Sequence, residues 1–360
     1  MKPSRPTSRR EFLRTSLFAS AAALAASRLP SLLAAGATQA APAGGTATSR
    51  VALTAGNDRA DLAFKALEPF KNEIAAAIGN KRVILKPNNV VINQPLAASH
   101  ADNLEGILEF LKSIGKTDIV IAESPAGGST FEGFANYGYD KLAGRYGVKL
   151  MDLDAEGFET MYCFDERDFR PHPCRMSKVL LDPNHFIVSA AKFKTHDRVV
   201  ATLSLKNIVV GAAIKDRSDA ESGGRRGGRS DKPITHGGGF RGINYNLFTL
   251  APRLHPHLAV VDGYEGMEGE GPVAGMPVDH RVCVASLDWL AADRVAAELM
   301  GIDFSKIGYL NYCAEAGDMG QADLSKIDVV GPAIKDHVKP YRLAASLEKQ
   351  LIWQQPVRQG

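Results

Sequence analysis

From Val51 onward, short apolar segments of strand length alternate with longer segments of helical apolar periodicity. Such alternation is typical of a mainly parallel sheet with helices on both faces, because each helix carries the chain from one parallel strand to the next. The sequence therefore predicts an α/β fold. The expected strands are residues 51–54, 82–86, 118–122, 149–153, 186–190, 258–262, 281–285 and 327–330, and the expected helices are residues 61–78, 102–115, 131–146, 243–254, 288–301 and 307–316.

Polar side chains gather where several of the expected strands end. Ligands of open parallel sheets bind beyond the carboxyl ends of the strands, so these side chains predict a functional site on one rim. The most prominent group is segment 192–196, Lys-Phe-Lys-Thr-His, which follows the apolar strand 186–190. Flanking apolar residues such as Val199 and Leu203 favour its being held in the core. A solvated loop is the alternative, because charge runs usually face water.

The chemistry of the rim residues suggests two sets of roles. The lysines suit a phosphate or carboxylate ligand, and a lysine crowded by other cations can lose its proton near neutral pH and act as a base. The predicted catalytic residues are Glu123, Lys194, His196 and Asp262. The predicted substrate-binding residues are Lys86, Asn88, Lys192, Lys206, Asn207 and Glu268.

Each of these assignments has a structural alternative. His196 suits general acid–base chemistry or metal ligation, and it equally suits a histidine that is hydrogen-bonded to the backbone. The carboxylates could hold a divalent cation through oxygen ligands, or they could form ion pairs with the lysines. No metal or organic cofactor can therefore be named from the residues.

The N-terminus reads as an export signal rather than as part of the core. Residues 8–13, Ser-Arg-Arg-Glu-Phe-Leu, match the twin-arginine signal, and the Ala/Leu-rich stretch 17–33 follows as its apolar region. Arg28 and Pro30 interrupt that stretch, which disfavours a membrane-spanning helix. We therefore expect passage through the twin-arginine translocase, a periplasmic or other extracytoplasmic location, and no stable membrane span after signal cleavage.

The basic character of the chain comes mainly from this leader. Six of the 43 Lys and Arg residues and one of the 40 Asp and Glu residues fall within residues 1–49, which leaves 37 basic against 39 acidic residues. A nearly neutral remainder does not indicate a nucleic-acid surface.

The cysteines bear on the cofactor and on the redox state. Cys163, Cys174, Cys283 and Cys313 lack the close spacing of iron–sulfur or structural zinc sites, so an iron–sulfur cluster is not expected. Cys283 lies in an apolar strand pattern and is interpreted as a core residue. Outside the cytoplasm, Cys163 and Cys174 could form a disulfide or remain free thiols.

We divide the chain into three regions. Residues 1–49 form the signal peptide and a linker, residues 50–338 form the α/β domain, and residues 339–360 form a polar C-terminal tail that is expected to pack loosely. A Gly/Arg-rich stretch predicts a flexible insertion at about residues 215–241, with His236 and three glycines near its end.

Several short motifs together resemble the bacterial and archaeal domain of unknown function 362 family. They are Lys86-Pro-Asn88, residues 192–196 with Lys206-Asn207 and Gly211, Asp262-Gly263 with Glu268-Gly-x-Gly-Pro272 and Gly275, and Asp293 followed by Leu299-Met-Gly301. The resemblance covers almost all of the chain after the leader. The family has no settled activity, so the resemblance implies a fold more than a reaction. Many relatives carry ferredoxin-like cysteine clusters, which this chain lacks.

Two classes of function are consistent with these observations. The first is an exported enzyme that acts on a small anionic substrate through the Lys/His/carboxylate cluster. The second is a non-catalytic ligand- or cofactor-binding or maturation protein, with a redox accessory role as a further alternative.

Overall fold

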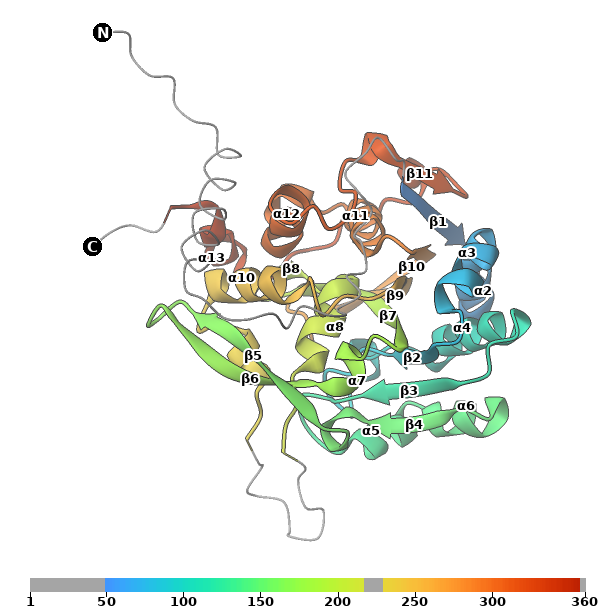
Figure 1. Ribbon diagram of the computed structural model, residues 1–360. Coiled ribbons are helices and arrows are strands. Elements are labelled where there is room, and N and C mark those ends of the chain that lie inside the picture. Colours follow the sequence, from blue (N-terminus) through green and yellow to red (C-terminus); the bar gives the residue numbers. More distant parts are fainter. Residues whose placement is uncertain (1–48, 217–228, 357–360) are drawn as a thin grey trace, which may run out of the picture.

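The computed structural model describes residues 49–216 and 229–356, so the predicted signal peptide and the centre of the predicted insertion lie outside the described residues (Figure 1). The strands are β1 (Ser49–Ala55), β2 (Arg82–Lys86), β3 (Ile119–Glu123), β4 (Lys149–Asp152), β5 (Phe158–Asp165), β6 (Arg170–Ser177), β7 (His185–His196), β8 (Val200–Ala201), β9 (Leu258–Glu268), β10 (Met276–Ser286) and β11 (Ile327–Val330). The helices are α2 (Arg59–Leu67), α3 (Lys71–Ile78), α4 (Ala101–Ser113), α5 (Thr130–Asn136), α6 (Tyr139–Tyr146), α7 (Lys178–Leu181), α8 (Leu203–Ala212), α9 (Lys232–Thr235), α10 (Phe240–Leu250), α11 (Trp289–Leu299), α12 (Gly308–Glu315) and α13 (Leu347–Gln350).

One large mixed sheet organises the described residues. Its strand order is β11-β1-β10-β9-β7-β2-β3-β4, with β8 paired to β7 off this path. The pairs β9-β7, β7-β2, β2-β3, β3-β4 and β1-β11 are parallel, whereas β10 is antiparallel to both β1 and β9. The predicted α/β fold with a mainly parallel sheet is confirmed.

Helices cover both faces of the sheet, as predicted, and each face has its own apolar core. One core contains side chains of α2, α3, α4 and α6 packed on alternate residues of the central strands. The other contains side chains of α8, α10, α11 and α12 packed on the opposite set. This division follows from the two-residue period of strands: Val188 and Ala190 of β7 face the first core, and Ile187 and Ala191 face the second.

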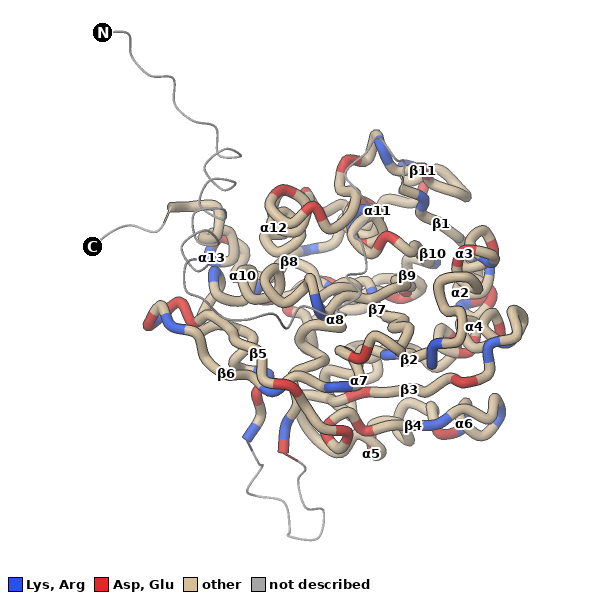
Figure 2. The backbone as a smooth tube through the Cα atoms, viewed as in Figure 1, with Lys and Arg blue, Asp and Glu red and all other residues tan. Residues whose placement is uncertain are grey.

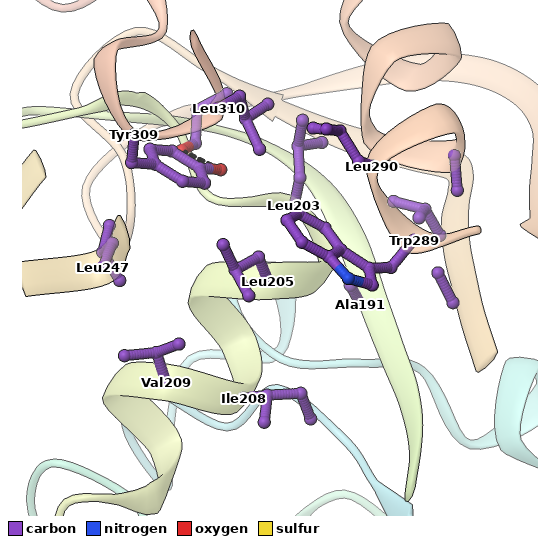
Figure 3. Packing of buried hydrophobic residues seen from close by; sticks show 14 of the residues in the cluster. Ala191, Leu203, Leu205, Ile208, Val209, Leu247, Trp289, Leu290, Tyr309 and Leu310 are labelled. Atoms are coloured by element: carbon purple, nitrogen blue, oxygen red, sulfur yellow. Dashed lines mark hydrogen bonds between the residues drawn. The ribbon is translucent and has the colours of Figure 1, made fainter. Parts of the chain in front are cut away.

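Helix α8 is buried on almost every side. Figure 3 shows Leu205 and Val209 facing Leu247 of α10, while Leu203 lies against Trp289 of α11. The helix contains two larger polar side chains, Lys206 and Asn207, which are also buried. A helix that is apolar on most sides belongs in a core, so these two polar groups need a specific reason to be there.

The N-terminus of α8 is stabilised by a carboxylate from another helix. Both oxygens of Asp293 in α11 accept backbone N–H bonds, from Ser204 at 2.8 Å and from Leu205 at 3.1 Å. The carboxylate satisfies donors at the start of α8 that have no partner within the helix. Its position explains why Asp293 belongs to the motif set identified in the sequence.

Strand β7 and the segment after β4 differ from their expected structure. Strand β7 continues to His196 instead of ending at residue 190, because residues 192–194 still pair with β9. Residues 158–177 form a two-stranded antiparallel hairpin, β5–β6, that the sequence pattern did not predict.

The C-terminal tail is packed, which corrects the expected loose packing. Tyr341, Ala344 and Gln350 are buried. Gln350 Oε1 accepts the backbone N–H of Val200 at 2.6 Å, and the Ser346 hydroxyl donates to the Asp197 carbonyl at 2.7 Å. The tail therefore supports the turn that follows β7.

The C-terminal part of the predicted flexible insertion also has defined structure. From residue 229 it contains α9, and Asp231, Lys232 and Thr235 are buried. Both oxygens of Asp231 accept hydrogen bonds from Arg175 of the hairpin. Residues 217–228 lie outside the described residues.

Candidate functional site

A cavity of about 170 Å³ opens where β2, β3 and β7 end beside α8, and we call it the α8 cavity. Its walls come from segments that are distant in sequence, as expected for the carboxyl ends of parallel strands. The lining residues are Lys86, Asn88, Asn89, Val90, Glu123, Ser124, Ala126, His196, Thr202, Lys206, Asn207, Val210, Gly211, Lys232, His236 and Pro272.

On one wall of the α8 cavity, Lys86 and Glu123 form a buried ion pair. Lys86 Nζ lies 2.7 Å from Glu123 Oε1, and both side chains are at most 2% exposed. Glu123 also accepts the backbone N–H groups of Ser124 at 2.8 Å and Asn89 at 2.9 Å. Burial lowers the pKa of Lys86, and the charge of Glu123 opposes that shift. The pair therefore joins the ends of β2 and β3, and its charges compensate each other.

Amide side chains extend this wall to Lys194. Asn207 Oδ1 accepts from Lys86 Nζ at 3.1 Å and from Asn88 Nδ2 at 2.9 Å. Asn88 Oδ1 in turn accepts from Lys194 Nζ at 2.5 Å, and Lys194 also donates to the Ala97 carbonyl at 2.7 Å. Burial lowers the pKa of Lys194 well below its usual value, and the nearby Lys192 and Lys206 contribute to the decrease. Lys194 thus supports Asn88 from behind the cavity wall.

Close packing against this wall explains a glycine of the sequence motifs. A side chain at Gly211 would place its Cβ 2.2 Å from Lys86 Cε and 2.5 Å from Lys86 Nζ. A side chain there would displace the Lys86 ammonium from its place beside Glu123, so Gly211 allows α8 to approach this group closely.

The opposite wall carries Lys206 and His196. Lys206 is 6% exposed and His196 is 2% exposed. Burial lowers the pKa of Lys206 to about 8, and Asp197 acts in the opposite direction. Burial also lowers the pKa of His196 well below its usual value, with Lys206 as the next contribution. Within residues 49–216 and 229–356, the Lys206 ammonium has no hydrogen bond or ion pair. The hydroxyl of Thr202, which also lines the α8 cavity, is buried without a partner there.

Two further cavity residues, Lys232 and His236, were not identified from the sequence. Lys232 Nζ donates to the Ala213 carbonyl at 2.6 Å, just beyond the C-terminus of α8, and burial lowers its pKa to about 7. His236 follows α9 directly, and burial lowers its pKa to about 4. Both lie in the predicted insertion, whose Gly/Arg-rich composition gave no sign of burial. The run of glycines after His236 was the one sequence feature that could have indicated close packing there.

Asp262 and Lys192 do not line the α8 cavity. They are opposite each other in the β9–β7 register, and Asp262 Oδ2 lies 3.5 Å from Arg59 Nε of α2. Burial raises the pKa of Asp262 and lowers that of Lys192, and each charge opposes the shift of the other. These residues, from β7, β9 and α2, form a second buried charge cluster that does not line the α8 cavity.

Glu268 also lies apart from the cavity, at the end of β9. Its Oε2 accepts the backbone N–H of Arg342 at 2.9 Å, so it contacts the C-terminal tail. The catalytic role of Asp262 and the substrate-binding roles of Lys192 and Glu268 remain predictions. In the structure these three residues contact other groups and do not line the α8 cavity.

The turn that carries His196 has an uncommon backbone conformation. Val200 and Leu203 have φ angles of 69° and 50°, in the left-handed region that branched residues rarely adopt. Gln350 holds the Val200 N–H, and the Tyr309 hydroxyl donates to the Thr202 carbonyl at 3.0 Å (Figure 3 shows Tyr309). Strained backbone that neighbouring groups hold in place is common at functional sites.

None of the four cysteines lines the α8 cavity. The four cysteines are buried free thiols in separate elements, with Cys163 and Cys174 together in the β5–β6 hairpin. Within the described parts of the chain, no group of three or more His, Cys, Asp or Glu side chains is placed to hold a metal ion. The cofactor therefore stays unassigned.

Two further features of the described residues are the arrangement of their charges and the character of their helices. In the view of Figure 2, basic and acidic residues are interspersed along the elements. Among residues 49–216 and 229–356, no helix has the length and apolar character needed to cross a membrane.

Comparison with known proteins identifies a family and one curated relative. The family described as "Domain of unknown function (DUF362)" matches residues 83–298. Thylakoid-associated protein sll1697 of Synechocystis sp. (strain ATCC 27184 / PCC 6803 / Kazusa) is 25% identical over 226 residues. That stretch covers 62% of this chain and 64% of the relative, so the match spans less than two thirds of the relative's length.

Proposed function

We propose that this protein, which belongs to the DUF362 family because the match over residues 83–298 covers more than half of the chain, is an exported enzyme. It binds a small anion, a phosphate or a carboxylate, in the α8 cavity. The observation that carries the proposal is the ammonium of Lys206 beside His196: the Lys206 side chain is largely buried and makes no hydrogen bond or ion pair among the described residues. A buried charge without a counter-ion is costly, and a bound anion would compensate it.

The size and charge of the α8 cavity support a small ligand. A volume of about 170 Å³ is below the range of roughly 300–1,000 Å³ that is usual for drug-sized ligands. Because Glu123 neutralises Lys86, the uncompensated positive charge of the cavity comes from Lys206 and Lys232. With a pKa of about 8, Lys206 can hold an anion when protonated and can exchange a proton near neutral pH.

Isothermal titration calorimetry with inorganic phosphate and with malonate tests the proposal. At pH 7 and low ionic strength, at least one of the two anions should bind with one site per chain, because Lys206 is then mostly protonated. If neither anion binds at millimolar concentration, the proposed function is wrong.

We also propose that the protein works outside the cytoplasm. The twin-arginine motif at residues 8–13 supports this location, and by analogy so does the name of the thylakoid-associated relative. Replacing Arg9 and Arg10 with lysine should leave an uncleaved, folded precursor in the cytoplasm, because the translocase reads the arginine pair. Cell fractionation with immunodetection measures the result, with Arg5→Lys as the matched control. Normal export of the double variant would contradict the prediction.

A further inference from the structure

The hydrogen bonds of His236 fix which of its ring nitrogens carries a proton. His236 Nδ1 lies 2.9 Å from the backbone carbonyl of Lys232, one helical turn earlier in α9. A carbonyl oxygen only accepts hydrogen bonds, so Nδ1 is the protonated nitrogen. The neutral ring therefore presents Nε2 as a hydrogen-bond acceptor. Burial lowers the pKa of His236 to about 4, so this neutral form is the one present near neutral pH.

His196 has the opposite arrangement. Its Nδ1 accepts the backbone N–H of Arg198 at 3.0 Å, so in the neutral ring the proton is on Nε2, which acts as a donor. The Asp197 carboxylate lies 3.2 Å from the same Nδ1 and would favour a charged ring. Asp197 is 46% exposed, however, whereas His196 is buried near Lys194, Lys206, Arg198 and His236, all of which disfavour the charged form.

The loop that carries His236 is held by the β5–β6 hairpin. The Glu166 backbone N–H donates to the Gly237 carbonyl at 2.9 Å, and Glu166 Oε2 accepts the Gly242 N–H at 2.6 Å. Gly237 has a φ of 54°, and a side chain there would contact Phe164 and Asn246 at distances under 3 Å. The orientation of the His236 ring is therefore built into the fold.

The two rings line the same cavity with complementary roles. His196 Nε2 and Lys206 Nζ can donate to the oxygens of an anion, whereas His236 Nε2 presents a lone pair. A fully deprotonated oxyanion has only lone pairs on its oxygens, and these would repel the lone pair of His236 Nε2. An oxyanion with one remaining hydroxyl would donate that proton to His236 and accept from the other two groups.

We propose that His236 makes the α8 cavity selective for a proton-bearing oxyanion of the phosphate class, whose hydroxyl donates to His236 Nε2 while its other oxygens accept from His196 and Lys206. This inference rests on the proposed function and narrows its ligand class. It assigns His236 as a specificity-determining residue.

Hydrogen phosphate and sulfate are the appropriate pair of probes. At mildly alkaline pH both are dianions of similar size and shape, and hydrogen phosphate alone carries a proton. Calorimetric titration of the protein should give a phosphate affinity roughly 10- to 100-fold higher than the sulfate affinity, the effect of one unpaired buried polar contact. In His236→Gln the two affinities should become similar, because a glutamine amide can turn to donate to sulfate.

His255→Gln is the matched control. His255 Nδ1 is bonded to the Ala251 carbonyl, also four residues earlier, and His255 does not line the α8 cavity. This variant should keep the phosphate preference. Equal affinities for phosphate and sulfate in the unmodified protein, or an unchanged preference in His236→Gln, would overturn the inference alone. If the protein binds malonate and does not bind phosphate, the inference is also wrong and the proposed function stands. If phosphate, sulfate and malonate all fail to bind, the proposed function is wrong as well.

Discussion

Replacing Lys206 with methionine should weaken anion binding in the α8 cavity and, in the absence of an anion, make the folded protein more stable at pH 7. A hydrogen bond to a charged group contributes about 1.5–3 kcal/mol, which corresponds to roughly a 10- to 100-fold loss of affinity. Methionine has a similar length and does not place a charge in the apolar surroundings of α8. Lys206→Met therefore distinguishes the contribution of Lys206 to anion affinity from its contribution to the free energy of unfolding.

The stability gain should depend on pH in a defined direction. Burial lowers the pKa of Lys206 from 10.5 to about 8 in the folded protein. Between these two pH values the unfolded chain binds more protons, so the stability of the unmodified protein rises as the pH increases from about 8 to 10.5. The methionine variant lacks this contribution. Its advantage, at most about 3 kcal/mol, should be greatest below pH 8 and disappear above pH 10.5.

Urea unfolding at several pH values, together with calorimetric titration of the bound anion, measures both effects. Lys65→Met is the matched control, because Lys65 is 56% exposed and pairs with Asp61 on the surface of α2. It should leave both the anion affinity and the stability essentially unchanged. If Lys206→Met destabilises the protein at pH 7 and leaves anion affinity unchanged, Lys206 is a structural residue and the proposed site is wrong.

The sequence predicted the part of the cavity that depends on strand ends. Lys86, Glu123 and His196 each lie at the end of a parallel strand, and the parallel pairing of β2, β3 and β7 brings those ends together. Asp262 satisfied the same sequence criterion. Its strand continues to Glu268, so Asp262 does not stand at a strand end but lies opposite Lys192 within the sheet.

The part of the cavity formed by Lys232 and His236 could not be predicted, because it depends on contacts between distant segments. Lys232 and His236 lie in a stretch whose composition resembles a flexible loop. Their burial results from the β5–β6 hairpin, in which Arg175 binds Asp231 and Glu166 binds the glycines that follow His236. The packed C-terminal tail has a similar explanation, since Gln350 reaches the backbone of Val200, a residue 150 positions earlier.

Breaking the Lys86–Glu123 pair should have the largest effect on stability. Glu123→Gln keeps the shape of the side chain, and it leaves the ammonium of Lys86 buried without a counter-charge. Removing one partner of a buried ion pair costs about 3–5 kcal/mol. The glutamine amide also has one acceptor oxygen, whereas Glu123 uses both of its oxygens to bind Lys86, Ser124 and Asn89.

A double-mutant cycle with Lys86→Met distinguishes an ion pair from two independent residues. The double variant contains neither charge, so it should be more stable than the sum of the two single losses implies, by at least about 2 kcal/mol. Arg82 and Asp118 supply the matched control at the other end of the same two strands. They form a 3.0 Å pair with side chains 40% and 60% exposed, and Asp118→Asn should cost at most about 1 kcal/mol. Urea unfolding of all variants at pH 7 measures these differences. If the two losses in the buried pair simply add, Lys86 and Glu123 stabilise the fold independently, and the predicted coupling between the two charges is wrong.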